Sequence, residues 1–218
     1  MTGNQIFEAV DHHIDGLFAS EDEALVRLRQ RAAGAGLPHI EVSAGQGKLL
    51  YLLARLVGAR RILEIGTLGG YSGIWLGRAL PPDGELVTLE LDPAYAAFAR
   101  QSFNEAGLGS QALILTGRAL DRLCELSGPY DLVFLDANKD EYPEYFAETA
   151  RLLRPGGLLL ADNVVRKGAI LAPPVDDAMA QGAARFLDIL SADPRFEAIV
   201  LQQIGIKGHD GLALARRL

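Results

Sequence analysis

The sequence predicts an α/β fold with a mostly parallel, seven-stranded sheet, an antiparallel last strand and helices on both faces. Three observations lead to this prediction. From Arg61 onward, short apolar runs alternate with helical patterns, as in a parallel sheet that is covered on both sides. A glycine-rich turn over 66–70 joins the first of these runs to a helix. The last two runs are joined by a short loop, which makes the last strand antiparallel.

Residues 1–57 are predicted to form the helical extension of one domain over 1–218, whose α/β core covers 58–218. Apolar residues at the start of the chain are three or four positions apart, the period of an amphipathic helix. They are Ile6, Val10, Ile14 and Leu17. A second helix follows over 21–33, glycines and a proline then break the chain, and Ser43 can cap a third helix.

The core elements follow in order along the chain. Strands are predicted over 61–65, 86–91, 111–115, 131–136 and 156–161, with helices near 70–80, 93–106, 118–126, 141–153 and 177–190. Two further strands, 196–203 and 210–216, are predicted to form a hairpin with a wide turn over 205–211. Right-handed crossovers place the carboxyl ends of the parallel strands at one edge of the sheet, where we expect the functional residues.

The composition and charge of the chain argue against several classes of function. The 218 residues carry a net charge of −7, whereas a nucleic-acid partner would require a basic patch. No apolar run reaches the ~20 residues of a membrane span, and none of signal length occurs at the N-terminus. The lone Cys124 cannot form an internal disulfide, and we expect it to be buried on its helix. These features predict a cytoplasmic protein with no nucleic-acid or membrane partner.

The turn after the first core strand is the strongest candidate for ligand binding. Its glycines permit a tight turn and the close approach of a ligand. Their spacing, G-x-x-G-G from Gly66, differs from the G-x-G-x-x-G of dinucleotide sites. Glu64 would repel a pyrophosphate but could accept a hydrogen bond from an ammonium group. The pattern resembles the first motif of S-adenosylmethionine-dependent methyltransferases; a ligand-free turn is the alternative.

Polar side chains also follow three other strands. Glu90 lies about 20 residues after the glycines, where an acid can bind ribose hydroxyls, and Asp92 is better suited to begin the next helix. Asp136, Asp162 and Asn163 follow the fourth and fifth strands and offer hard oxygen ligands for magnesium, calcium or manganese. The alternative is that Asp162 and Asn163 only begin a turn. Neighbouring carboxylates repel each other, which favours a bound cation or ligand.

Residues 41–218 resemble the cation-dependent O-methyltransferase family, which includes catechol and caffeoyl-coenzyme A O-methyltransferases. The matching stretches are Ser43-Ala-Gly-Gln-Gly-Lys48, Leu63-Glu-Ile-Gly-Thr67, Gly70-Tyr-Ser72, Glu90-Leu-Asp-Pro93, Phe134-Leu-Asp-Ala-Asn-Lys-Asp140 and Ala161-Asp-Asn-Val-Val165. The ending 203–212 is more similar to bacterial members. The resemblance implies a single Rossmann-like class I methyltransferase domain, a homodimer and a small aromatic acceptor.

The resemblance also implies residue roles. The residues around S-adenosylmethionine would be Val42, Glu64, Gly66, Thr67, Tyr71, Ser72, Glu90, Ala119 and Asp136. A divalent cation, magnesium first with calcium or manganese as alternatives, would be bound by Asp136, Asp162 and Asn163. Lys139 would be the general base, acting together with Asp136; the alternative is a surface lysine paired with Asp140. The family often has an acid at the position of Asn138.

The implied reaction is attack of a phenolate oxygen on the sulfonium methyl group. Cation coordination would lower the pKa of the phenol, and a vicinal dihydroxy aromatic acceptor could use both oxygens. Two other readings stay open. A non-catalytic S-adenosylmethionine-binding protein would not require Asp136, Lys139, Asp162 and Asn163. A nicotinamide-dependent oxidoreductase would be expected to carry the missing dinucleotide fingerprint.

Overall fold

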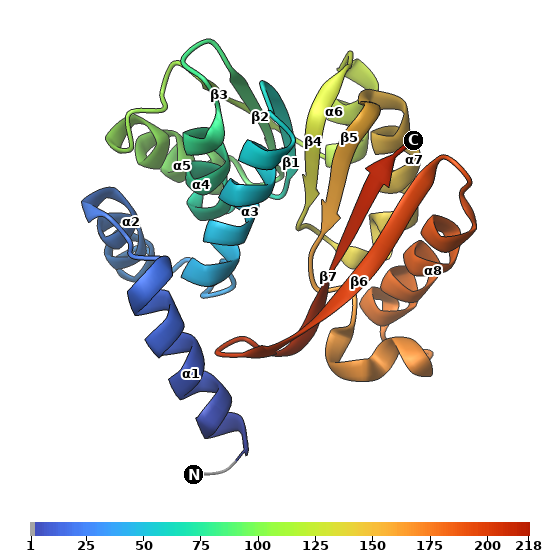
Figure 1. The fold of residues 1–218 in the computed structure, drawn as a ribbon. Coiled ribbons are helices and arrows are strands. Elements are labelled where there is room, and N and C mark those ends of the chain that lie inside the picture. Colours follow the sequence, from blue (N-terminus) through green and yellow to red (C-terminus); the bar gives the residue numbers. More distant parts are fainter. Residues whose placement is uncertain (1–2) are drawn as a thin grey trace.

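Residues 3–218 are described by a computed structural model, shown as a ribbon in Figure 1. The strands are β1 (Arg61–Ile65), β2 (Glu85–Glu90), β3 (Ala112–Thr116), β4 (Tyr130–Leu135), β5 (Leu153–Ala161), β6 (Phe196–Gly205) and β7 (Gly208–Arg217). The helices are α1 (Gly3–Phe18), α2 (Glu23–Gly34), α3 (Ala44–Leu56), α4 (Tyr71–Ala79), α5 (Pro93–Glu105), α6 (Ala119–Glu125), α7 (Tyr142–Leu152) and α8 (Ala178–Ala192). Two 3₁₀ segments, η1 (Lys139–Glu141) and η2 (Arg166–Leu171), follow β4 and β5.

Within these residues, seven strands form one sheet in the order β3-β2-β1-β4-β5-β7-β6. The five strands from β3 to β5 are parallel, and β7 runs antiparallel to both of its neighbours. The predicted mixed sheet and its antiparallel last strand are confirmed. The predicted wide turn is wrong, because pairing of β6 with β7 continues to Gly205 and Gly208. Gly208 closes this tight turn in the left-handed conformation, with φ of +84°.

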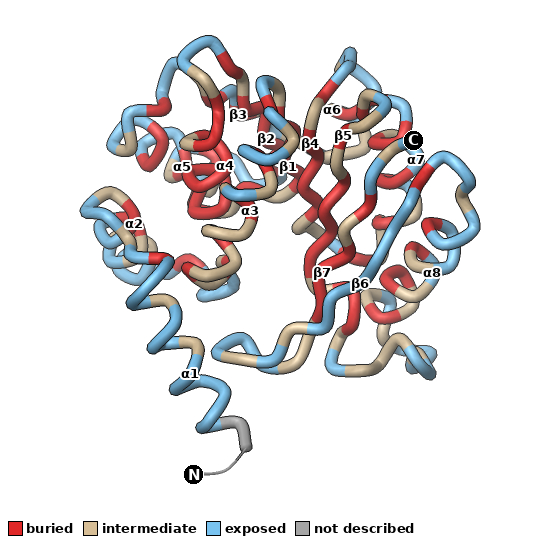
Figure 2. Tube along the Cα trace, in the orientation of Figure 1, coloured by how far each residue is buried: buried red, intermediate tan, exposed pale blue. Residues whose placement is uncertain are grey.

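Helices cover both faces of the sheet, as predicted. Side chains alternate along β1, so Ile62 packs with α2, α3, α4 and α5 while Leu63 packs with α6, α7 and α8. Figure 2 shows the buried central strands between these two layers. The same alternation places Glu64, Thr88 and Glu90 on the face that α4 covers.

The N-terminal helices lie beside the sheet, and α1 extends away from the body of the molecule (Figure 1). The predicted cap of α3 is present, because the Ser43 side chain accepts a hydrogen bond from the backbone N–H of Gln46 at 3.2 Å. None of the helices in residues 3–218 has both the length and the apolar character for a membrane crossing.

Cys124 corrects the prediction of a buried thiol, because it is exposed. It lies on the short helix α6, whose buried residue is Leu123. Consecutive helix positions are about 100° apart, so burying Leu123 turns its neighbour toward solvent.

Candidate active site

A cavity of about 850 Å³ opens at the carboxyl ends of β1, β2 and β4. Backbone hydrogen bonds continue the parallel ladder one residue past these strands. The N–H of Gly66 bonds to Leu89 O, and the N–H of Asp136 bonds to Ile65 O, at 3.1 and 2.9 Å. The ladder therefore sets the turns that follow β1 and β4 side by side at the rim of the cavity.

Gly66 is the point of closest approach between these two turns. It has a φ of +101°, and a Cβ built there would lie 2.1 Å from the carbonyl oxygen of Asp136. A side chain would therefore collide with backbone, which is far more costly to move than a flexible side chain. The glycine is required by packing between strand ends as well as by the turn.

Glu64 is completely buried on β1, and two hydroxyl groups hold its carboxylate. Ser72 Oγ of α4 and Thr88 Oγ1 of β2 each donate to it at 2.6 Å. Burial raises the pKa of Glu64 to about 7 despite these two bonds, and the charges of Asp136 and Glu90 add to the rise. The carboxyl group is thus close to its titration point at neutral pH.

The Glu90 carboxylate ties the end of β2 to the glycine turn. Its Oε2 accepts the backbone N–H of Leu68 at 2.7 Å and that of Thr67 at 3.3 Å. Its Oε1 accepts only the N–H of Asp92, at 2.9 Å, among the described residues. Since a carboxylate oxygen has two lone pairs, Oε1 keeps acceptor capacity for a ligand hydroxyl.

The N-terminal segment reaches the site through Tyr71, the first residue of α4. Tyr71 is 2% exposed, and its hydroxyl donates to Glu21 at 2.7 Å. Arg29 of α2 pairs with the same carboxylate at 2.8 Å and lies 4.5 Å from the centre of the Tyr71 ring. These contacts hold α2 against the cavity, which it lines with Leu28 and Ala32.

Lys139 follows β4 and is 7% exposed. Its Nζ lies 2.8 Å from Asp136 Oδ1, so the alternative of a surface lysine paired with Asp140 is wrong. The Met179 sulfur accepts the backbone N–H of Lys139 at 3.1 Å. A Cβ at Gly182 of α8 would lie 2.1 Å from Lys139 O. Close packing of α8 therefore fixes this segment.

Asp162 and Asn163 follow β5 and lie in different environments. Asp162 is 3% exposed, and burial together with the neighbouring Asp136 carboxylate holds its pKa well above the usual range. Asn163 lines the cavity with φ of +54°, a left-handed conformation that is uncommon outside glycine. The Tyr142 hydroxyl, also buried, donates behind the site toward Leu135 O and Asp162 O, at 2.9 and 3.1 Å.

No group of three His, Cys, Asp or Glu side chains suited to a metal ion occurs in residues 3–218. A cation at these strand ends would therefore depend on two carboxylates and one amide. The donor chemistry fits a hard divalent ion, because a cation would relieve the charge repulsion between Asp136 and Asp162.

The sequence matches the O-methyltransferase family over residues 16–218. The chain belongs to this family. A catechol O-methyltransferase of Niastella koreensis is 50% identical to this O-methyltransferase over 216 residues, covering 97% of this chain and 98% of that protein. A catechol O-methyltransferase of Mycobacterium tuberculosis is 45% identical over 207 residues, covering 94% of each.

The fold comparison agrees. The crystal structure of the O-methyltransferase TomG from Streptomyces achromogenes, which is involved in tomaymycin synthesis and was solved in complex with SAM, is 47% identical to this chain. It gives a TM-score of 0.96 and covers 100% of this chain and 99% of that one. The family, the Rossmann-like methyltransferase fold and the enzyme class expected from the motifs are thereby confirmed.

The O-methyltransferase cavity gathers most of the predicted site residues. Those that line it are Val42, Gly66, Thr67, Tyr71, Ser72, Glu90, Ala119, Asp136, Lys139 and Asn163. Glu64 and Asp162 do not line it, and both are buried. Glu64 is linked to the cavity by Ser72, and Asp162 is adjacent to Asn163, so each is one residue removed from the cavity wall.

Sequence reasoning missed several residues that build the site. Thr88 lies two positions before Glu90, so strand alternation could have placed it on the same face, and the register of β1 against β2 sets it beside Glu64. Glu21 and Asp210 could not be found in this way, because each accepts hydrogen bonds from a segment that is distant in the sequence. Asp210 Oδ1 accepts the backbone N–H groups of Val165 and Arg166, both at 3.0 Å, and so holds the loop after Asn163.

Proposed function

We propose that this enzyme transfers a methyl group from S-adenosylmethionine to one hydroxyl of a catechol-like acceptor, with the help of a divalent cation. The contact of Gly66 with the backbone of Asp136 carries this proposal. It joins the glycine turn, suited to the cofactor, to the strand end that carries Asp136 and Lys139, within one cavity. Ligand pockets measure about 300–1,000 Å³, so a volume near the upper end suits a cofactor and an acceptor together.

The cofactor side is assigned by charge and hydrogen-bonding capacity. Ser72, with Glu64 behind it, suits the amino group, and Glu90 Oε1 suits a ribose hydroxyl. Val42, Thr67, Tyr71 and Ala119 supply the remaining wall in this proposal. The SAM complex of the TomG structure supports this choice of cofactor.

The acceptor side is assigned to the ends of β4 and β5. Asp136, Asp162 and Asn163 would hold a divalent cation, magnesium first, and such an ion lowers the pKa of a coordinated hydroxyl. Lys139 would accept the hydroxyl proton. The acceptor oxygen forms a bond to the methyl carbon while the carbon–sulfur bond breaks, and S-adenosylhomocysteine leaves. The catechol O-methyltransferases among the relatives support a vicinal dihydroxy acceptor.

Methyl transfer to matched dihydroxybenzenes tests the proposal. The purified enzyme would receive S-adenosylmethionine and either a 1,2- or a 1,3-dihydroxy acceptor, with magnesium or with a chelator. We expect turnover of the 1,2-isomer that is lost on chelation and restored by magnesium, with little turnover of the 1,3-isomer. Equal turnover of both isomers in chelator would refute the metal and acceptor assignments. Cofactor binding without turnover of either isomer would favour a non-catalytic protein.

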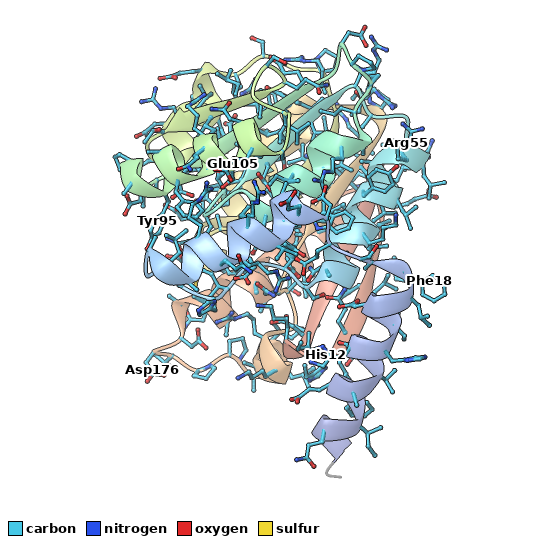
Figure 3. All side chains as sticks on the ribbon, turned by 90° about the vertical axis from the view of Figure 1, so that its left-hand side faces the viewer. His12, Phe18, Arg55, Tyr95, Glu105 and Asp176 are labelled. Atoms are coloured by element: carbon cyan, nitrogen blue, oxygen red, sulfur yellow. The ribbon has the colours of Figure 1, made fainter. Side chains whose placement is uncertain are left out.

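We further propose that residues 1–218 act as one domain, that two copies form a homodimer, and that the enzyme is cytoplasmic. The apolar surface of α1 supports the dimer. Its exposed large apolar side chains are Ile6, Phe7, Val10, Ile14, Leu17 and Phe18. Figure 3 shows Phe18 at the outer edge of the molecule. Contiguous exposed apolar surface of this kind marks an interaction site.

A further inference from the structure

Arg166 stands out among the cations of the active-site cavity. Four Arg or Lys side chains line this cavity. Three of them pair with carboxylates: Arg29 with Glu21, Arg118 with Glu141 and Lys139 with Asp136.

Arg166 forms no salt bridge with any described residue, and its Nε is buried without a hydrogen-bond partner. An unpaired buried donor of this kind costs about 1–3 kcal/mol, and a ligand group that accepted its hydrogen bond would remove this cost.

The backbone of Arg166 is held in an unusual conformation. Arg166 and Lys167 have φ of +53° and +55°, in the left-handed region that non-glycine residues seldom occupy. Asp210 Oδ1 accepts the N–H of Arg166, and a Cβ at Gly211 would lie 2.4 Å from Val165. Contacts from the start of β7 therefore fix the conformation of this turn. Strain that the surrounding structure enforces is typical of ligand-binding segments.

The position of Arg166 assigns it to the acceptor rather than to the cofactor. It follows β5, three residues after Asn163, whereas Glu90 ends β2. Three strand spacings separate β2 from β5 in the sheet, or about 14 Å. Arg166 thus follows the same strand as the proposed metal ligands Asp162 and Asn163, and its segment is separated from the strand end that carries Glu90.

The charge of the cavity limits what Arg166 can bind. Among the described residues, five carboxylates and four cations line the cavity. Glu41, Asp136 and Glu141 each form an ion pair with one of the other three cations, so Arg166 is the cation left to face an anionic group of an acceptor. A guanidinium presents a planar fork of donors that matches a carboxylate.

We propose that Arg166 binds a carboxylate of the methyl acceptor, which makes the substrate class vicinal dihydroxy aromatic carboxylic acids. This inference rests on the proposed function. Arg166 determines acceptor specificity and takes no part in proton transfer. The charge-assisted hydrogen bonds should favour the acid over a neutral analogue of the same shape by about tenfold to a hundredfold.

The test compares 3,4-dihydroxybenzoate with 3,4-dihydroxybenzamide in the wild-type enzyme and in Arg166→Gln. We expect kcat/KM of the wild type to be about tenfold or more higher for the acid. In Arg166→Gln the two acceptors should become nearly equal, with turnover of the amide and affinity for S-adenosylhomocysteine unchanged. Lys167→Gln is the matched control, since Lys167 has the same charge and backbone conformation but is exposed and does not line the cavity.

Two outcomes would overturn the inference: a wild-type enzyme that does not prefer the acid, or an acid preference that survives in Arg166→Gln. The first outcome is measured on the wild-type enzyme alone, so it tests the inference even if Arg166→Gln fails to fold. If the proposed function itself is wrong, the wild-type enzyme will turn over neither acceptor. In that case, calorimetric binding of the acid and the amide to the wild type still tests Arg166. Equal affinities, or no binding of the acid, would refute its role.

Discussion

Lys139 Nζ lies 2.8 Å from Asp136 Oδ1, and the two side chains are only 9% and 19% exposed. In the proposed reaction, Asp136 also binds the cation, so the cation and Lys139 share one carboxylate. The ion pair thus places the proposed base directly beside the proposed cation site.

Replacing Lys139 by methionine should lower kcat about a hundredfold or more, the usual contribution of a general base. The affinity for S-adenosylmethionine should change little, because Lys139 is not among the residues proposed to contact the cofactor. Single-turnover kinetics and calorimetry measure the two effects separately. Lys207→Met, in the exposed turn between β6 and β7, is the control. Wild-type kcat in Lys139→Met would exclude Lys139 as the base.

Glu64 should make cofactor binding depend on pH. Below its pKa of about 7 the carboxyl group is neutral, and above it the carboxylate attracts the positive charges of the cofactor. Affinity should therefore rise by at most about tenfold per unit as pH increases toward 7, and then level off. Calorimetry from pH 5.5 to 8 measures this slope, and Glu64→Gln should flatten it. The same slope in Glu64→Gln would assign the titration to another group.

The raised pKa of Glu64 also affects folding. The folded chain keeps this proton up to about pH 7, whereas the unfolded chain loses it near 4.5. The stability that Glu64 contributes is therefore present below pH 4.5 and is lost as pH rises through 7. Denaturation of the ligand-free enzyme should show this loss, and Glu64→Gln should reduce it.

Gly66→Ala should destabilise the fold by about 2 kcal/mol or more and prevent cofactor binding, because the added methyl group collides with the backbone of Asp136. Gly36→Ala is the matched control. Gly36 also has a positive φ, +72°, but has open space around it, so only the backbone cost of about 1 kcal/mol applies. Urea denaturation compares the two variants. Equal destabilisation of the two variants would show that the close contact with the Asp136 backbone makes no difference to stability.

Charges on the exposed face of α1 should dissociate the proposed homodimer. The double variant Phe7→Asp, Val10→Asp places two carboxylates among apolar side chains that would be buried between copies. Light scattering after size exclusion should give twice the chain mass for the wild type and the chain mass for this variant. Val175→Asp, at an isolated apolar residue that is 96% exposed, should remain dimeric. A monomeric wild type would disprove the dimer.

Local periodicity in the sequence was enough to predict most of the sheet. Alternating apolar strands and helical stripes placed Gly66, Glu90, Asp136 and Asn163 at one edge, since parallel strands present their carboxyl ends together. The hairpin turn was predicted too wide, because the glycines over 205–211 looked like loop residues, whereas two of them end paired strands. Glycine permits both outcomes, and only the register of β6 against β7 selects one.

The parts of the site that sequence reasoning missed depend on contacts between distant segments. Glu21 reaches Tyr71 across fifty positions, and Asp210 reaches Val165 across forty-five. Nothing in the neighbourhood of either acid distinguishes it from a solvated surface charge. Tyr142 gave a helical pattern but no sign that its hydroxyl would lie between the backbones of β4 and β5.

The central claim is that Asp136, Asp162 and Asn163 hold a divalent cation that the acceptor can reach. Manganese binding, followed by water-proton relaxation, tests it most directly, because the signal reports both the ion and the water molecules on it. We predict strong enhancement in the wild type, a drop when a catechol acceptor displaces water, and loss of binding in Asp162→Ala. Asp176→Ala, in the loop after η2 (Figure 3), should behave like the wild type. Unchanged manganese binding in Asp162→Ala, or an acceptor that leaves the relaxation unaltered, would contradict the claim.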